Sequence, residues 1–263
     1  MQKETPDIKN AVSKTGHAMI WFYAAALTAA EIITAYSSPI YGILCHVILL
    51  LALLAHASMS YKQDIHTVYA VLSLAPLVRI SSLSMPLVSV PPMYWYLIIS
   101  LPLFTAAFYI MKLAGYKPRK VGLVAGNLPL QLLVAFLGMP LGLIEYLILK
   151  PQPLVPALTL QYAWLPALIL LFSTGFLEEF IFRGIMLRAA AETLGTWYGI
   201  FYVSLIFAAL HITHRSPADL IFVFAVSLLF SITVGFFRSI LGVSLAHGIT
   251  NIGLYILWPF ILK

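Results

Sequence analysis

Two adjacent carboxylates and an arginine stand in one of the most apolar parts of this chain, in residues 177–184 (Leu-Glu-Glu-Phe-Ile-Phe-Arg-Gly). Ionisable groups are costly in hydrocarbon, so they are rare there and tend to mark working sites. The chain has only 9 acidic residues, and Glu178 and Glu179 are neighbours in this segment. The segment is therefore the first candidate for a site that performs chemistry.

Residues 172–191 contain no proline and are predicted to form a helix. On a helix, Glu179 and Arg183 lie four residues apart with the acid first, which is the favourable order for an ion pair. Glu178 points about 100° away around the axis, so it faces a different neighbour. Arg183 would keep Glu179 ionised, whereas burial and the adjacent charge would leave Glu178 able to exchange protons near neutral pH. The alternative is that these residues form a paired charge cluster at a helix end, whose side chains extend to water and have no catalytic role.

The composition indicates the environment in which this segment folds. Hydrophobic residues make up 62% of the chain and charged residues 9%, against about 45–50% and about 25% in soluble domains. Apolar runs near 20 residues recur, which favours spanning helices over the shorter alternating segments of a barrel. The net charge of +6 fits cationic loops, so we expect the lipid bilayer as a partner and no nucleic acid. The predicted fold is an all-α, polytopic transmembrane bundle of eight or nine spans.

The candidate spans are separated in several places by proline. They cover residues 18–36, 41–57, 67–83, 93–113, 121–149, 162–185, 197–212, 220–237 and 243–262. Proline-containing breaks occur at Pro39, Pro91-Pro92, 151–156 and Pro217. The segment 67–83 is the weakest candidate because it contains Pro76 and Arg79, and an interfacial or re-entrant segment is the alternative.

Lysine and arginine predict the orientation of the chain, because they concentrate on the cytoplasmic side of membrane proteins. Basic residues precede the first span and follow the fourth: Lys3, Lys9 and Lys14, and then Lys112, Lys117, Arg119 and Lys120. An even number of spans separates the two groups of basic residues, so both groups lie on the same side of the membrane. We therefore expect a multi-pass protein of the plasma (inner) membrane with a cytoplasmic N-terminus.

Two further polar groups follow the glutamates. Phe207 and His211 are four residues apart, as are His247 and Asn251, so each pair shares a helix face. With a turn at Gly195, Glu178 is 17 residues before it and His211 is 16 after it, which places both at nearly the same depth. His247 would start ~20 Å away if the span before it crossed fully. Tilt, an incomplete crossing or a hinge would be needed to bring it to the others.

In this order, the residues Glu178-Glu179-x-x-x-Arg183, Phe207-x-x-x-His211 and His247-x-x-x-Asn251 resemble the motifs of the CAAX protease and bacteriocin-processing (Abi) family of intramembrane endopeptidases. The resemblance covers roughly the last 100 residues. It divides the chain into N-terminal transmembrane helices of unassigned role, 1–155, and a protease-like core, 156–263.

The resemblance implies a role for each motif residue. Glu178 resembles the general base that activates a water, and His211 resembles the group that holds or polarises that water. His247 and Asn251 resemble the groups that stabilise the oxyanion. Glu179 and Arg183 resemble a supporting ion pair, and Phe207 is expected to serve in packing. The implied activity is endopeptidase cleavage of membrane-associated or C-terminally tagged proteins.

A zinc-dependent version of this protease is the alternative. Glu178, His211 and His247 could bind zinc, and family members are often labelled metalloproteases. However, the chain has no His-Glu-x-x-His run, and the cationic Arg183 disfavours a dication nearby. We expect no cofactor, with zinc on those three residues as the competing prediction.

Other classes of protein fit less well. Residues 242–244 form a Gly-Val-Ser near His247, but Leu245 stands where a rhomboid-like serine protease would have glycine. An aspartyl protease is excluded because Asp7, Asp64 and Asp219 are not paired within a span. A transporter or a membrane scaffold is the non-enzymatic alternative, although no internal repeat is visible.

Several lone ionisable residues stand in the other apolar runs. They are Glu31, His46, His56, Arg79 and Glu145. We expect most of these side chains to be paired with other polar groups in a structural role, or to extend to the membrane–water interface. The alternative is that they line a cavity.

Overall fold

The structure, a computed structural model, describes residues 14–87 and 89–262. Within these ranges every regular element is helical and there is no strand. Nine helical stretches of the described residues are long and apolar enough to cross a membrane. The chain is therefore a multi-pass integral membrane protein with an all-α fold, as predicted. Lys3, Lys9 and Asp7, which entered the arguments above, lie outside the described residues.

The elements are α1 (Lys14–Tyr36), α2 (Pro39–Met59), α3 (His66–Leu72), α4 (Leu74–Ser84), η1 (Met85–Leu87), α5 (Pro92–Leu113), η2 (Pro118–Val121), α6 (Leu128–Phe136), α7 (Gly138–Leu149), α8 (Leu160–Leu170), η3 (Leu171–Phe176), α9 (Leu177–Glu179), η4 (Phe180–Met186), α10 (Leu187–Leu194), α11 (Thr196–Ala209), η5 (Ile212–His214), α12 (Pro217–Phe237), α13 (Leu241–Ile252), η6 (Gly253–Leu257) and α14 (Trp258–Ile261). The uncertain segment 67–83 falls in α3 and α4, which together form a stretch of 19 residues, enough to span.

Proline and serine decide where several helices begin. Pro39, Pro92 and Pro217 occupy the first turns of α2, α5 and α12, where a missing N–H breaks no helical hydrogen bond. Ser38 and Ser216 cap α2 and α12, since each side chain accepts a backbone N–H of the first turn. The predicted breaks at these prolines therefore coincide with real helix starts.

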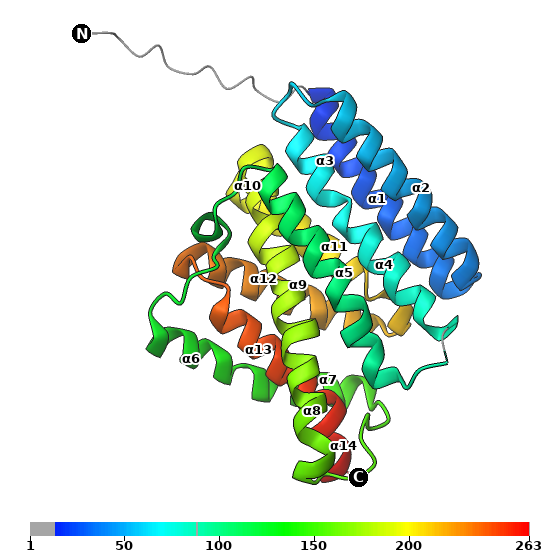
Figure 1. The fold of residues 1–263 in the computed structure, drawn as a ribbon, viewed down its shortest axis with the longest axis vertical. Coiled ribbons are helices and arrows are strands. Elements are labelled where there is room, and N and C mark those ends of the chain that lie inside the picture. Colours follow the sequence, from blue (N-terminus) through cyan, green and yellow to red (C-terminus); the bar gives the residue numbers. More distant parts are fainter. Residues whose placement is uncertain (1–13, 88, 263) are drawn as a thin grey trace.

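Helices α1 to α4 lie along one flank of the bundle, and the last third of the chain forms the other flank (Figure 1). One hydrophobic cluster contains residues of both flanks, including Ile20, Leu72, Phe180 and Tyr202, none of them more than 2% exposed. The Tyr202 hydroxyl donates to the Ile20 carbonyl at 2.9 Å. The two flanks therefore pack as one body around α9 and η4.

The span Leu160–Leu194 contains the two glutamates and is the longest helix of the described chain, with 35 residues. Two segments of it, η3 and η4, are π-helical, and they enclose the single α-turn α9. The span ends at Gly195, whose φ of +86° is favourable only for glycine, at the predicted turn. The π-helical segments were not predicted; they occur frequently at functional sites and change which residues share a face.

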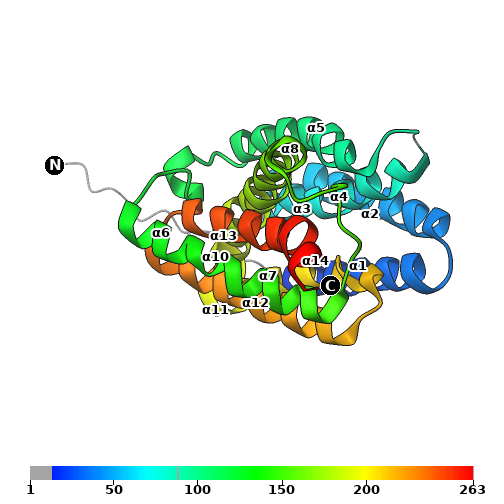
Figure 2. The ribbon, with the colours of Figure 1, turned by 90° about the horizontal axis from the view of Figure 1, so that it is seen from below.

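Helix α12 runs obliquely to the long span rather than beside it (Figure 1). In the view from below, α6, α7 and α13 cross the bundle in roughly the same direction as α12 (Figure 2). An oblique α12 advances little along the axis of the long span. The chain therefore enters α13 close to the depth of the glutamates. Tilt, one of the three options considered above, removes the expected ~20 Å offset of His247.

The contact between η3 and α13 depends on a glycine. A Cβ added at Gly175 would lie 2.6 Å from the carbonyl oxygen of Ser244 and 2.7 Å from the nitrogen of Gly248. We expect Gly175→Ala to push the two helices apart and lower the free energy of unfolding by ~1–3 kcal/mol. Gly235→Ala on α12 is the matched control, because a Cβ there meets no atom within 4 Å. Thermal unfolding in detergent compares the two, and equal Tm values would contradict the close contact.

Candidate active site

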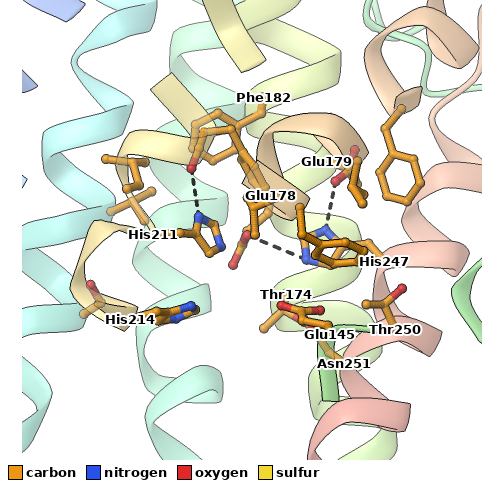
Figure 3. A pocket seen from close by; sticks show the side chains of 18 of the residues that line it. Glu145, Thr174, Glu178, Glu179, Phe182, His211, His214, His247, Thr250 and Asn251 are labelled. Atoms are coloured by element: carbon orange, nitrogen blue, oxygen red, sulfur yellow. Dashed lines mark hydrogen bonds and ion pairs between the residues drawn. The ribbon is translucent and has the colours of Figure 1, made fainter. Parts of the chain in front are cut away.

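A cavity of about 240 Å³ lies between the spans that carry the three motifs (Figure 3). Its wall includes all seven residues singled out in the sequence: Glu178, Glu179, Arg183, Phe207, His211, His247 and Asn251. They come from α9, η4, α11, the turn after α11, and α13. The fold therefore brings the motifs together in one concave site within the membrane-spanning region.

The two neighbouring glutamates face in different directions. The Glu178 side chain is 28% exposed and borders the cavity, whereas the Glu179 side chain is completely buried. A buried carboxylate requires partners from the protein. Glu178, by contrast, is positioned to meet water or a ligand that enters the cavity.

Glu179 receives two hydrogen bonds on a single oxygen. Arg183 Nη1 donates to Glu179 Oε1 at 2.8 Å, so the predicted ion pair is present. His247 Nδ1 lies 2.8 Å from the same oxygen. The carboxylates of Glu178 and Glu179 and the guanidinium of Arg183 together carry a net charge of −1. A protonated His247 would neutralise this charge.

Phe207 does more than the packing expected of it. Its ring lies under the Arg183 guanidinium, 4.1 Å from the ring centroid to Cζ, which is a close cation–π contact. Its carbonyl oxygen lies 2.8 Å from His211 Nδ1. One residue thus supports both the arginine that holds Glu179 and the histidine of the same motif.

The hydrogen bond to Phe207 determines the tautomer of His211. A carbonyl oxygen can only accept, so Nδ1 of His211 carries the proton and donates it. In the neutral ring Nε2 is then an acceptor. Figure 3 shows this ring next to the cavity that Glu178 borders. His211 and Glu178 therefore offer two acceptors to one small molecule such as water.

His247 lies between the two carboxylates. Its Nδ1 contacts Glu179, and its Nε2 is 3.9 Å from Glu178 Oε2 (Figure 3). A carboxylate fixes the orientation of the ring through Nδ1–H, so a doubly protonated His247 presents Nε2–H toward the cavity. That is the geometry of a donor aimed at an anion.

Asn251 is held in place by Thr174, a residue that the sequence reasoning missed. Asn251 Nδ2 donates to Thr174 Oγ1 at 2.8 Å, and Thr174 Oγ1 donates to the Leu170 carbonyl at 2.5 Å. Both side chains line the cavity. Thr174 is four residues before Glu178, and this spacing in a helix was the available signal.

Thr174→Val keeps the shape of the side chain but removes the acceptor that orients Asn251. We expect a lower kcat for peptide hydrolysis, by up to the roughly 10²–10³-fold that loss of one oxyanion donor costs, with only a small decrease in Tm. Ser173→Ala is the control, because Ser173 bonds instead to Ser100 Oγ at 3.2 Å. Cleavage rates and thermal unfolding of the two variants test this, and unchanged kcat in Thr174→Val would speak against it.

The lone ionisable residues divide into two groups. Arg79 donates to Glu31 at 2.5 and 2.8 Å, and His46 Nε2 lies 2.9 Å from Glu31 Oε1. His56 Nδ1 lies 2.7 Å from the Tyr23 hydroxyl. The structural interpretation therefore holds for these residues, although Arg79 also borders the cavity. Glu145 is different: it is 7% exposed and lines the cavity, and no hydrogen bond reaches its side chain from the residues that the structure describes.

The rival protease classes lack their groups in the cavity. Ser244 is 3% exposed and does not belong to the cavity wall, so the Gly-Val-Ser run faces a helix contact instead. Asp219 pairs with His214 Nδ1 at 2.8 Å, with no second aspartate beside it among the described residues. A serine or aspartyl mechanism therefore has no support in the site.

The same geometry bears on zinc. Among residues 14–87 and 89–262, no group of three or more His, Cys, Asp and Glu side chains is arranged to hold a metal ion. His247 and His211 each use Nδ1 for a protein partner, which leaves Nε2 of each ring free for a ligand, and the Arg183 guanidinium lies next to the carboxylates. The absence of a cofactor and zinc on Glu178, His211 and His247 therefore stay competing predictions.

Residues 159–253 match the model of a protein family described as Rce1-like, the type II CAAX prenyl endopeptidases. The matched region includes all three motifs, in agreement with the resemblance that the motifs predict. The match is a similarity of about a third of the chain to a family of endopeptidases. No curated protein and no solved structure gives a significant match.

Proposed function

We propose that this protein is an intramembrane endopeptidase that uses a glutamate-activated water. The supporting observation is the cavity in which Glu178, His211, His247 and Asn251 meet. Peptide hydrolysis needs an activated nucleophile, a donor for the developing oxyanion and a proton for the leaving amine. The four side chains offer one group for each need.

Glu178 and His211 form the nucleophile side of the site. A water bound between the Glu178 carboxylate and His211 Nε2 would have both hydrogens engaged and a lone pair free. Glu178 takes one proton as the hydroxide attacks the scissile carbonyl carbon, and it then delivers that proton to the leaving nitrogen. His211 keeps its neutral tautomer through the bond to Phe207 and positions the water.

His247 and Asn251 form the electrophile side. Nε2–H of a protonated His247 and the second N–H of Asn251 would donate to the oxyanion of the tetrahedral intermediate. Both donors are fixed before substrate arrives: His247 by Glu179, and Asn251 by Thr174. Fixed donors in a site of low dielectric stabilise developing charge without a cost of reorganisation.

We further propose that the N-terminal and C-terminal parts of the chain have different roles. The C-terminal core, residues 156–263, supplies the reacting groups. The preceding helices, within residues 1–155, supply walls of the cavity through Arg79, Tyr96 and Glu145. The substrates proposed are membrane-anchored or C-terminally tagged proteins. The proposed location is the plasma (inner) membrane with the N-terminus in the cytoplasm, supported by the basic residues that precede the first span and follow the fourth in the sequence.

The proposal is tested with the protein purified in detergent and a mixed library of membrane-anchored peptides, read by mass spectrometry. We expect cleavage by the wild type that survives a metal chelator. Loss of cleavage with the chelator and its return with zinc would instead support the zinc-dependent version. Absence of any cleavage in the library, with a folded protein, would favour a scaffold or transporter.

A further inference from the structure

A second cavity, of about 600 Å³, has Arg183 in its wall, as the catalytic cavity does. Its wall carries Arg119 and Lys120 from η2, Arg188 from α10 and Arg238 from the end of α12. No carboxylate is among its lining residues. The proposed mechanism uses none of these four side chains.

The charges around this cavity are not balanced by the protein. Lys120 Nζ and Arg188 Nη2 share one carboxylate, Glu192 Oε1, at 2.8 and 2.7 Å. No ion pair reaches Arg119 or Arg238 from any residue in the described ranges of the chain. Four cations therefore face one acid, which leaves a surplus of three positive charges at the mouth.

The inner wall of the same cavity holds buried donors without partners. Among the residues that the structure describes, none forms a hydrogen bond with Arg183 Nε or Nη2, although Arg183 is 2% exposed and its Nη1 is bound to Glu179. The Ser231 hydroxyl is also buried and unbonded, at 0% exposure. Unsatisfied buried donors are costly, so a small movement of Arg183 or Ser231 toward an acceptor bound in the cavity would be favourable.

We propose that this cavity binds a phosphate group, as the head of an anionic phospholipid or as a free phosphate compound. Arginines match phosphate oxygens in a bidentate fork, and the volume is in the range of small-molecule sites. Arg119 and Arg238 meet the phosphate at the mouth, and the buried donors of Arg183 and Ser231 lie on the inner wall. Arg183 is shared with the catalytic cavity, but Arg119, Lys120, Arg188 and Arg238 take no part in the proposed hydrolysis, so phosphate binding can be tested separately from the protease activity.

The test uses the full-length protein in nanodiscs of phosphatidylcholine, with or without phosphatidylglycerol, and in detergent with inorganic phosphate. We expect phosphatidylglycerol to raise the Tm of the wild type, because a ligand of the native state stabilises it. Arg119→Gln/Arg238→Gln should weaken the apparent affinity ~10-fold or more, through the loss of charge-assisted contacts. Arg215→Gln, at the other end of the bundle, is the control and should respond like the wild type.

The experiments with phosphatidylglycerol and with inorganic phosphate distinguish a lipid head group from a free phosphate compound. A Tm shift with phosphatidylglycerol but not with inorganic phosphate assigns the site to a lipid head, and a shift with both assigns it to phosphate in general. Equal shifts in the wild type and in Arg119→Gln/Arg238→Gln would overturn the proposal, as would no shift in either medium. Both single variants, Arg119→Gln and Arg238→Gln, replace exposed side chains and serve if the double variant is unstable.

Discussion

Glu178→Gln is expected to reduce kcat/KM for peptide cleavage by roughly 10²–10⁴-fold, the range lost when a general base is removed. The amide has the shape of the carboxyl group but cannot take a proton from water. Within the described part of the chain, the only ion pair or hydrogen bond of this side chain is the long contact of 3.9 Å to His247 Nε2, so the Tm should change little. Initial cleavage rates with the peptides that the wild type cuts, measured beside thermal unfolding, separate chemistry from stability.

Glu145→Gln is the matched control for this prediction. Glu145 is a buried carboxylate in the wall of the same cavity, but it belongs to none of the three motifs. A much smaller loss of activity in Glu145→Gln than in Glu178→Gln would show that the position matters, beyond a general loss of negative charge. A larger loss of activity in Glu145→Gln than in Glu178→Gln would instead identify Glu145 as the general base.

The second large effect is expected at the buried ion pair. Arg183→Met leaves Glu179 charged and buried beside one remaining partner, His247. Removal of one member of a buried pair costs roughly 3–5 kcal/mol in the free energy of unfolding. We also expect a loss of cleavage, because Arg183 is packed against Phe207, which holds His211. Thermal and denaturant unfolding in detergent measure the first effect.

The double variant Glu179→Gln/Arg183→Met separates stability from catalysis. Removal of both charges should restore most of the stability, since no buried ion is left unpaired. Cleavage should stay roughly 10²-fold below the wild type, because a neutral amide cannot stabilise a protonated His247. If activity returned together with stability, the charge on Glu179 would have only a structural role.

The class of the fold followed from the sequence because a bilayer imposes simple rules. Every spanning segment must satisfy its own backbone, so length and apolarity identify helices without knowledge of tertiary contacts. The turn at Gly195 and the helix starts at Pro39, Pro92 and Pro217 were equally local, since each depends on the backbone preference of one residue. Even the weak segment with Pro76 and Arg79 forms a span, with Arg79 paired to Glu31.

The sequence was less informative about distances between segments. The Glu179–Arg183 pair is a contact of residues four apart, so helical spacing predicted it. The shared depth of Glu178 and His211 followed from counting through one turn. The position of His247 did not, because it depends on the tilt of α12, and tilt is determined by packing against other helices.

The sequence by itself determined the membrane class, the helical spans and the seven residues whose motifs point to a protease. Only the tertiary structure decided the remaining features of the site. It added Thr174 and Glu145 to the cavity and changed Phe207 from packing to a partner of Arg183. It also formed a second, basic cavity with that arginine in its wall. The physical reason is that residue type and spacing encode local preference, whereas tilt, π-helical turns and cavities arise when distant helices pack against one another.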